Sequence, residues 1–162
     1  VNVSMRNLLE PDLAERIADT LDRFELPASS LVLEVTERDI TDERALSRLD
    51  VRSLRELGVG LSIDDFGTGH SSLVRLQQMP VTELKIDQRF VSGLGTDPEA
   101  PILVRSIVEL CRSLGLDCVA EGVERREQAE ILLDLGGQMA QGFYFSPAVT
   151  ADTFDQLDFV SY

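Results

Sequence analysis

The stretch "LSIDDFGTGH", residues 61–70, ends an apolar, strand-like run with two adjacent carboxylates, Asp64 and Asp65, and a flexible Gly-Thr-Gly. Adjacent acids repel each other, so a fold gains no stability by placing them together where water is scarce. A positive group is therefore expected nearby. A simpler interpretation is that the two acids cap a helix that begins at "SSLVRL", residues 71–76.

Similar short apolar runs alternate along the chain with segments of helical periodicity. The helical segments, each with an apolar stripe, are 11–26, 42–57, 99–114 and 125–135. Segment 99–114 places Ile102, Ile107, Cys111 and Leu114 on one face and stops at Gly115. The apolar runs are 1–4, 30–35, 59–64, 83–87, 117–122 and 140–145. Such alternation is typical of parallel βα units. The sequence therefore predicts an α/β fold built on a parallel sheet.

The composition is that of one globular domain, with 162 residues of which 43% are hydrophobic and 27% charged. A net charge of -14 at pH 7 argues against a long nucleic acid as partner, but not against a small phosphate ligand held through metal ions. No apolar run approaches the roughly 18 residues of a membrane span, so we expect a cytoplasmic location. Cys111 and Cys118, with a single His in the chain, indicate neither a zinc site nor a disulfide framework and are expected to be buried thiols.

Polar side chains gather at the ends of the apolar runs. They are Asn2, Glu34 with Glu37, Asp64 with Asp65, Lys85 with Asp87, Glu121 with Glu124, and Gln141. In a parallel barrel the carboxyl ends of the strands meet at one mouth, where such enzymes keep their chemistry. Carboxylate and amide oxygens suit Mg²⁺ or Mn²⁺ rather than zinc. Adjacent carboxylates can bind two such ions, a known device for phosphodiester cleavage.

Two more side chains fit this chemistry. Lys85 can hold a water or a developing phosphoryl charge. Glu121 is a candidate proton acceptor, since a carboxylate crowded by others has a raised pKa. Alternatives stay open: Lys85 could form a strand-end salt bridge, Glu121 could cap the 125–135 helix, and Asn2 and Gln141 could satisfy backbone groups.

Six segments, in this order and spacing, match one known family. They are "VNVS", "LVLEVTE", "LSIDDFGTGHSSL", "ELKIDQRFV", "CVAEGVE" and "QGFYFSPAV". Together they resemble the EAL domain, the cyclic di-GMP phosphodiesterase of bacterial signalling. The resemblance covers residues 1 to about 148. It implies a TIM-type barrel with one strand reversed, and hydrolysis of cyclic di-GMP to linear pGpG with Mg²⁺ or Mn²⁺.

The resemblance also implies which residues hold the metals. Asn2, Glu34 and Asp64 look like ligands of the first ion, and Asp64 with Asp65 like ligands of the second. Glu37 resembles the glutamate that holds the DDFGTG loop in place. That loop and its following helix form the usual dimer face of the family, so a homodimer is expected.

Three matching positions look catalytic. Lys85 resembles the lysine that orients the attacking water. Glu121 resembles the glutamate proposed as a ligand or general base, and Gln141 the glutamine near the water and metals.

Two departures from the family pattern are apparent. Position 70 is His where the family usually has an aromatic residue, which affects the loop and dimer face. The Glu-Ala-Leu tripeptide, with its metal-binding Glu, is absent from the 162 residues. We therefore expect residues 1–162 to be the C-terminal two-thirds of an EAL domain, an incomplete TIM-like barrel of about six strands that is inactive in isolation.

For the parent protein, we expect a phosphodiesterase that could also carry sensor or GGDEF domains and a membrane anchor upstream. One alternative is an EAL module that binds cyclic di-GMP without cleaving it. Degenerate members usually lose DDFGTG or the lysine, and both are present here. A barrel enzyme for sugar phosphates would need a glycine-rich phosphate loop near the last strands, which "QGFYFSPAV" matches poorly.

Overall fold

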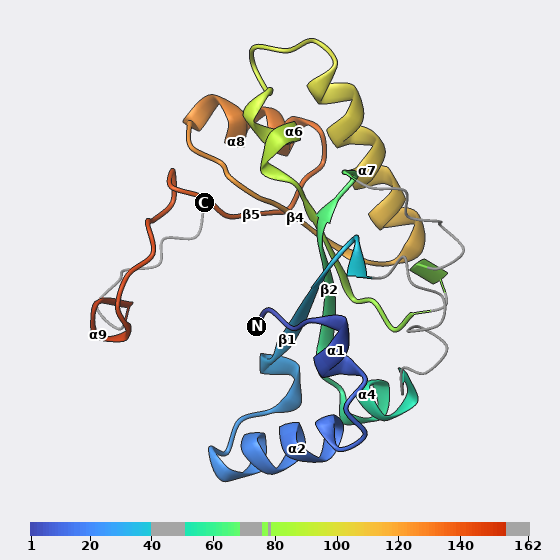
Figure 1. Cartoon of the computed structure of the whole chain (residues 1–162). Helices are drawn as coiled ribbons and strands as arrows, with labels where there is room; N and C mark the ends of the chain where they lie inside the picture. Colours follow the sequence, from blue (N-terminus) through green and yellow to red (C-terminus); the bar gives the residue numbers. More distant parts are fainter. Residues whose placement is uncertain (40–50, 69–75, 78, 155–162) are drawn as a thin grey trace.

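A sheet of five parallel strands in the order β1-β2-β3-β4-β5 forms the centre of the molecule (Figure 1). The computed structural model describes residues 1–39, 51–68, 76–77 and 79–154. The strands are β1 (Val32–Thr36), β2 (Gly60–Phe66), β3 (Glu83–Ile86), β4 (Asp117–Ala120) and β5 (Met139–Ala140). Parallel neighbours need crossover connections, and helices supply them here. The α/β fold predicted from the sequence is therefore confirmed.

The helices lie at the two ends and along one side of this sheet (Figure 1). They are α1 (Met5–Leu8), α2 (Leu13–Arg23), η1 (Ala28–Ser30), α4 (Val51–Leu57), α6 (Gln88–Ser92), α7 (Ala100–Leu114), α8 (Arg126–Asp134) and α9 (Ala151–Phe154). The predicted helix over 42–57 is described only from Val51, and its first part lies outside the described residues.

The two faces of the sheet differ in polarity. The register aligns Val35, Ile63 and Leu84 across β1, β2 and β3, and all three are almost fully buried. These residues share a hydrophobic core with Cys111 of α7. One position earlier, the same register aligns Glu34, Ser62 and Glu83, which point to the opposite face because side chains alternate along a strand.

Helix α7 covers part of the apolar face and packs against β3 and β4. Its buried residues are Ala100, Val104, Val108 and Cys111, which recur every three or four positions as expected of a helix stripe. The sequence placed Ile102 on the buried face, which is wrong, because Ile102 is 66% exposed. The predicted stop at Gly115 is correct, since this residue caps α7 with a φ of 69°.

The first and last predicted strands are shorter than expected. Asn2 makes a single parallel bridge with Glu34, after which α1 begins with Ser4 as its cap. Strand β5 ends at Ala140, and the chain turns at Gly142, where a Cβ atom would clash with the backbone of Val123. Strand pairing therefore stops after Asn2 and after Ala140, where the backbone turns.

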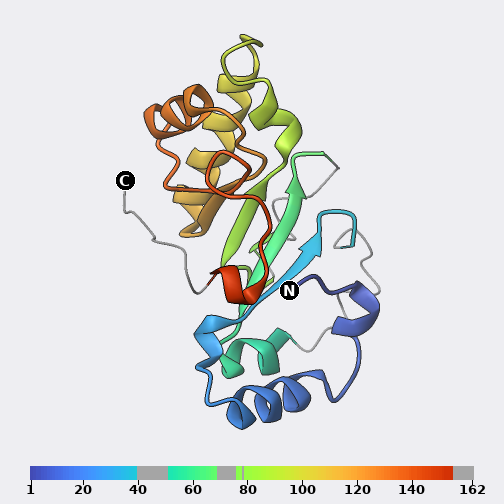
Figure 2. The same ribbon diagram turned by 90° about the vertical axis from the view of Figure 1, so that its left-hand side faces the viewer.

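The sheet is open in the part of the chain that the structure describes, with β5 at one edge. Beyond β5, residues 143–154 are exposed. Helix α9 stands away from the sheet in Figure 1 and lies in front of it in the perpendicular view (Figure 2). This open sheet agrees with the expected incomplete barrel. No helix within the described residues is both long and apolar enough to span a bilayer.

Candidate functional site

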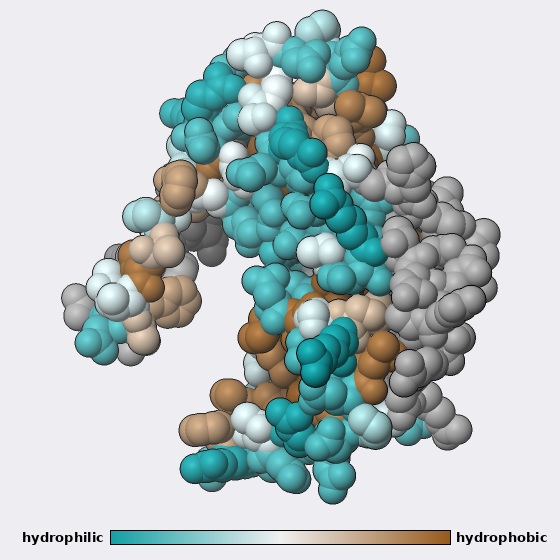
Figure 3. Space-filling view, in the orientation of Figure 1, coloured by the Kyte–Doolittle hydropathy of each residue, from teal (hydrophilic) through white to brown (hydrophobic). Residues whose placement is uncertain are grey.

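The polar face of the sheet carries charged side chains at the carboxyl ends of its strands. Hydrophilic residues gather across the centre of the molecule, over the strands (Figure 3). Asp64 lies at the end of β2, and Lys85 lies on β3 beside Val119 of β4. Glu121 follows β4 directly. The topology thus brings residues separated by long stretches of sequence to one edge.

A bulge in β2 brings Asp64 and Asp65 to the same side. In a regular strand these neighbours would face opposite ways, but the register with β3 shifts between Ile63 and Phe66. Asp65 has a φ of 56°, a conformation that Asp tolerates better than most residues. Its backbone N–H donates to the Asp64 Oδ1 at 2.9 Å. The start of the helix that the two acids could cap, at residues 71–75, lies outside the described residues.

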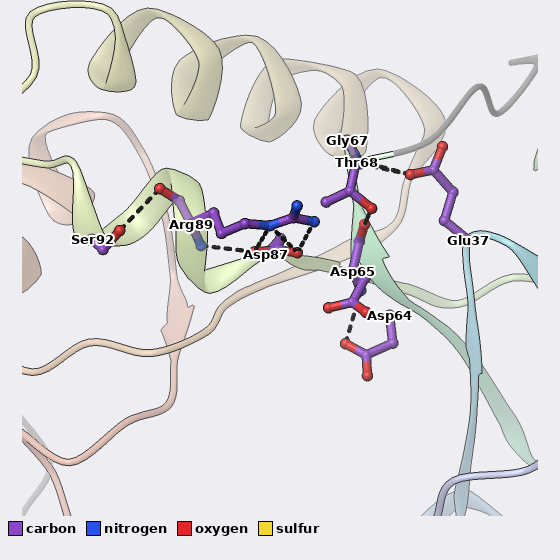
Figure 4. Close-up of polar contacts among 8 residues, drawn as sticks. All are labelled: Glu37, Asp64, Asp65, Gly67, Thr68, Asp87, Arg89 and Ser92. Atoms are coloured by element: carbon purple, nitrogen blue, oxygen red, sulfur yellow. Dashed lines mark hydrogen bonds and ion pairs between the residues drawn. The ribbon is translucent and has the colours of Figure 1, made fainter.

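Glu37 holds the loop after these acids. Its Oε2 accepts hydrogen bonds from the backbone N–H groups of Gly67 and Thr68, each at 3.0 Å (Figure 4). The Thr68 hydroxyl donates to the Asp65 carbonyl at 3.0 Å. The carboxylate of Glu37 is buried with 2% exposure, so these donors replace its lost water. The loop conformation therefore depends on an acid that directly follows β1.

Lys85 lies between two glutamates. Its Nζ is 3.0 Å from Glu34 Oε1 and 2.8 Å from Glu121 Oε1. Burial alone would lower the pKa of Lys85, but its hydrogen bonds to Glu121 and Glu34 outweigh burial and raise that pKa. Lys85 therefore stays charged. It forms the strand-end salt bridge that was one interpretation of this residue. The positive group that acts on Asp65 is Arg89.

One carboxylate oxygen of Glu121 binds two side-chain donors. Besides Lys85, the Gln141 side chain donates from Nε2 to Glu121 Oε1 at 2.7 Å. Burial raises the pKa of Glu121, aided by the charges of Asp64 and Asp65 and opposed by Lys85. Helix α8 starts instead with Arg125 and Gln128 as its capping residues, so Glu121 is not its cap.

Asp64, Asp65 and Glu121 form a carboxylate cluster suited to a metal ion. One oxygen of each lies within 4.8 Å of the others. The pKa of Asp65 is raised by burial and by the charge of Asp64. Because three anionic oxygens converge, the donor set fits a hard divalent cation such as Mg²⁺ or Mn²⁺. Glu34 and Asn2 lie on the adjacent β1 side of this cluster, bridged through their backbones.

Sequence reasoning missed a second ion pair beside the cluster. Asp87 is 3% exposed and accepts from the Arg89 backbone N–H at 2.7 Å and from its Nη2 at 2.8 Å (Figure 4). These bonds lower the pKa of Asp87, whose carboxylate also contacts Asp65. An acid at a strand end followed two residues later by Arg is a helix-capping pattern that could have indicated this pair. His70 and the helix predicted after DDFGTG lie outside the described residues.

The comparisons with known proteins all identify the same domain family. The sequence profile of the EAL domain matches residues 1–148. The cyclic di-GMP phosphodiesterase RocR of Pseudomonas aeruginosa is 39% identical over 160 residues, which are 99% of this chain and 40% of RocR. Across the curated relatives compared, the chain spans 19% to 40% of their length.

Solved structures give the same result. The EAL domain of Mycobacterium smegmatis DcpA matches with a TM-score of 0.88 and 38% identity, over 96% of this chain and 70% of that one. The manganese and cyclic di-GMP complex of Klebsiella pneumoniae BlrP1 matches with a TM-score of 0.83 and 33% identity, over 91% of this chain and 38% of that one. The open sheet therefore has the curvature and order of part of a TIM-like EAL barrel.

Proposed function

Because this chain belongs to the EAL domain family, we propose that its protein hydrolyses cyclic di-GMP to linear pGpG with Mg²⁺ or Mn²⁺. The observation that carries this proposal is the convergence of Asp64, Asp65 and Glu121 within 4.8 Å at the carboxyl edge of the sheet. A fold does not gather three acids for stability, since they repel each other.

The carboxylate cluster and its neighbours would hold the cations. Asn2, Glu34 and Asp64 are the proposed ligands of one ion, and Asp64 with Asp65 those of a second. Divalent cations bound there would polarise the phosphodiester and lower the pKa of a water. Glu34 is already paired with Lys85, so a cation would share this carboxylate with the lysine.

Lys85, Glu121 and Gln141 are the proposed catalytic residues. Lys85 and Gln141 both bind Glu121 Oε1, and Glu121 Oε2 has no hydrogen-bond partner in the residues that the structure describes. This second oxygen is available to accept a proton from the attacking water. The raised pKa of Glu121 favours that role, because a base works best when its pKa approaches the working pH. Lys85 would stabilise negative charge that develops on the phosphoryl group.

The test is hydrolysis of cyclic di-GMP by the full-length protein, with pGpG measured by liquid chromatography in the presence of Mg²⁺ or Mn²⁺. The wild type should form pGpG and Asp64→Ala should form none. Glu130→Ala, which removes an exposed partner of Arg126 on α8, is the matched control and should keep full activity. An active Asp64→Ala enzyme would refute the site, and a wild type that binds cyclic di-GMP without cleaving it would refute the reaction.

We also propose that the protein forms a homodimer through the DDFGTG loop and the following helix. Of this loop, the structure describes Asp64 to Thr68, anchored by Glu37. Light scattering of the full-length protein should give the mass of a dimer. A monomer at micromolar concentration would contradict the proposal.

A further inference from the structure

Cys111 and Cys118 meet where α7 turns into β4. Helix α7 ends at Leu114, and the left-handed Gly115 reverses the chain. The Leu116 N–H donates back to the Cys111 carbonyl at 2.9 Å, which closes the turn. Cys118 pairs in register with Leu84 of β3, on the apolar face that α7 covers. The turn therefore directs the Cys118 side chain towards the buried stripe of α7, which contains Cys111.

The two thiols contact each other and differ in access. Cys118 packs against the hydrophobic cluster that contains Cys111, and both residues line a cavity of about 210 Å³ together with Arg112 and Gly136. Cys111 is 1% exposed, whereas Cys118 is half-buried. The sequence prediction of two buried thiols is therefore correct only for Cys111.

We propose that Cys111 and Cys118 form an oxidisable thiol pair, in which a hydroperoxide reacts at Cys118 and Cys111 then closes an intrachain disulfide. The inference stands on the packing of α7 against β4 and does not depend on the proposed phosphodiesterase activity. It places a covalent modification site on the opposite face of the sheet from the carboxylate cluster.

The reaction balances with one peroxide for each pair. The Cys118 thiolate attacks one oxygen of hydrogen peroxide, the O–O bond breaks, and the hydroxide that leaves takes up the proton released by Cys118 to form water. The Cys111 sulfur then attacks the Cys118 sulfenic acid, forming the S–S bond and breaking the S–O bond. The second hydroxide leaves as water with the Cys111 proton. The thiols lose two electrons in all, and the peroxide gains them.

The surroundings make Cys118 the attacking residue. Its hydrogen bond from Cys111 lowers the pKa of Cys118, against the opposing effects of burial and of the Glu83 charge. The same hydrogen bond and burial raise the pKa of Cys111. A thiolate is the reactive form of cysteine, so Cys118, the less buried and more acidic thiol, reacts first.

The disulfide would tie α7 to the strand that leads to the carboxylate cluster. Val119 follows Cys118 and pairs with Lys85, and Glu121 lies three positions beyond Cys118. Oxidation would therefore fix the start of β4 against α7.

The test treats the native full-length protein with hydrogen peroxide and quenches the reaction. Free thiols are then blocked with N-ethylmaleimide in denaturant, and peptides are mapped by mass spectrometry without reduction. We expect neither Cys111 nor Cys118 to carry N-ethylmaleimide after oxidation. A peptide that links the two residues should be lighter by two hydrogens than the sum of the reduced peptides, and dithiothreitol should fully reverse the link. Cys111→Ser should leave Cys118 as a sulfenic acid that dimedone traps. Cys118→Ser should leave Cys111 unoxidised in the folded chain.

Circular dichroism of both serine variants checks that they remain folded. The proposal is overturned if native Cys111 labels as fast as Cys118 before oxidation. It is also overturned if peroxide converts Cys118 to sulfinic acid, or links two chains, while the intrachain peptide stays absent.

Discussion

Ser62 and Ile63 are neighbours on β2 with the same 0% exposure, yet they lie on opposite faces of the sheet. Ile63 packs in the hydrophobic core between β1 and β3. Ser62 lies between Glu34 and Glu83, and its hydroxyl has no hydrogen-bond partner in the described part of the chain. The apolar face thus buries side chains that need no polar partner, whereas the polar face buries a hydroxyl that lacks one within the described residues. Buried side chains on the two faces therefore contribute differently to stability.

The largest expected effect tests the two neighbours directly. Ile63→Ala should lower the free energy of unfolding by about 2–5 kcal/mol, because it removes buried methyl groups and leaves a cavity. Ser62→Ala should leave that free energy unchanged or raise it, since a buried hydroxyl without a partner is unfavourable. Urea unfolding followed by circular dichroism measures both. Similar losses of unfolding free energy in the two variants would contradict this difference between the two faces of the sheet.

Lys85→Met should have the next largest effect, because it leaves Glu34 and Glu121 close together without their shared cation. Breaking a buried ion pair costs up to about 5 kcal/mol, and the partial exposure of both glutamates reduces this to roughly 2–3 kcal/mol. The loss should shrink at acidic pH as Glu121, whose pKa is raised by burial, becomes protonated. Arg126→Ala, which breaks an exposed pair with Glu130, is the control and should change stability by less than about 1 kcal/mol. A Lys85→Met protein as stable as wild type at neutral pH would contradict this.

Removing the Glu37 carboxylate, which anchors the loop at Gly67 and Thr68, should have a smaller effect on stability. Glu37→Ala removes the acceptor for the Gly67 and Thr68 N–H groups and should reduce stability by about 1–3 kcal/mol. Glu37→Gln keeps one acceptor oxygen and should recover part of that loss. Hydrogen exchange at Gly67 and Thr68 should accelerate in Glu37→Ala, and unchanged protection there would argue against the anchor.

The smallest effect concerns pH in the absence of divalent cations. The folded pKa of Asp65 lies above its ordinary value of 3.8, so the folded chain retains a proton that the unfolded chain has released. Stability attributable to Asp65 is therefore lost as the pH rises through this interval. Asp65→Asn should be more stable than wild type by a few tenths of a kcal/mol at neutral pH, because Asp65 is largely exposed and screened. The higher stability of Asp65→Asn should vanish below the ordinary carboxyl pKa. A stability difference that persists at lower pH would contradict this explanation.

The sequence was sufficient for features that depend on local pattern. The apolar run before Asp64 predicted β2, and Gly115 predicted the end of α7. Features that depend on partners from other strands were not predictable. The bulge that turns Asp64 and Asp65 to one side requires a φ of 56° at Asp65 and a shift in the register with β3. The terminal strands were overestimated for the same reason, because strand length is set by the neighbouring strand.

The most direct measurement is calorimetric titration of Mn²⁺ into the 162-residue chain and its variants. The account predicts saturable binding to the wild type, loss of binding in Asp64→Asn and at least tenfold weaker binding in Glu121→Gln, a change of about 1.4 kcal/mol. The Glu130→Gln control should bind like wild type. If Asp64→Asn binds Mn²⁺ as tightly as the wild type, the acids of the polar face do not form the cation site.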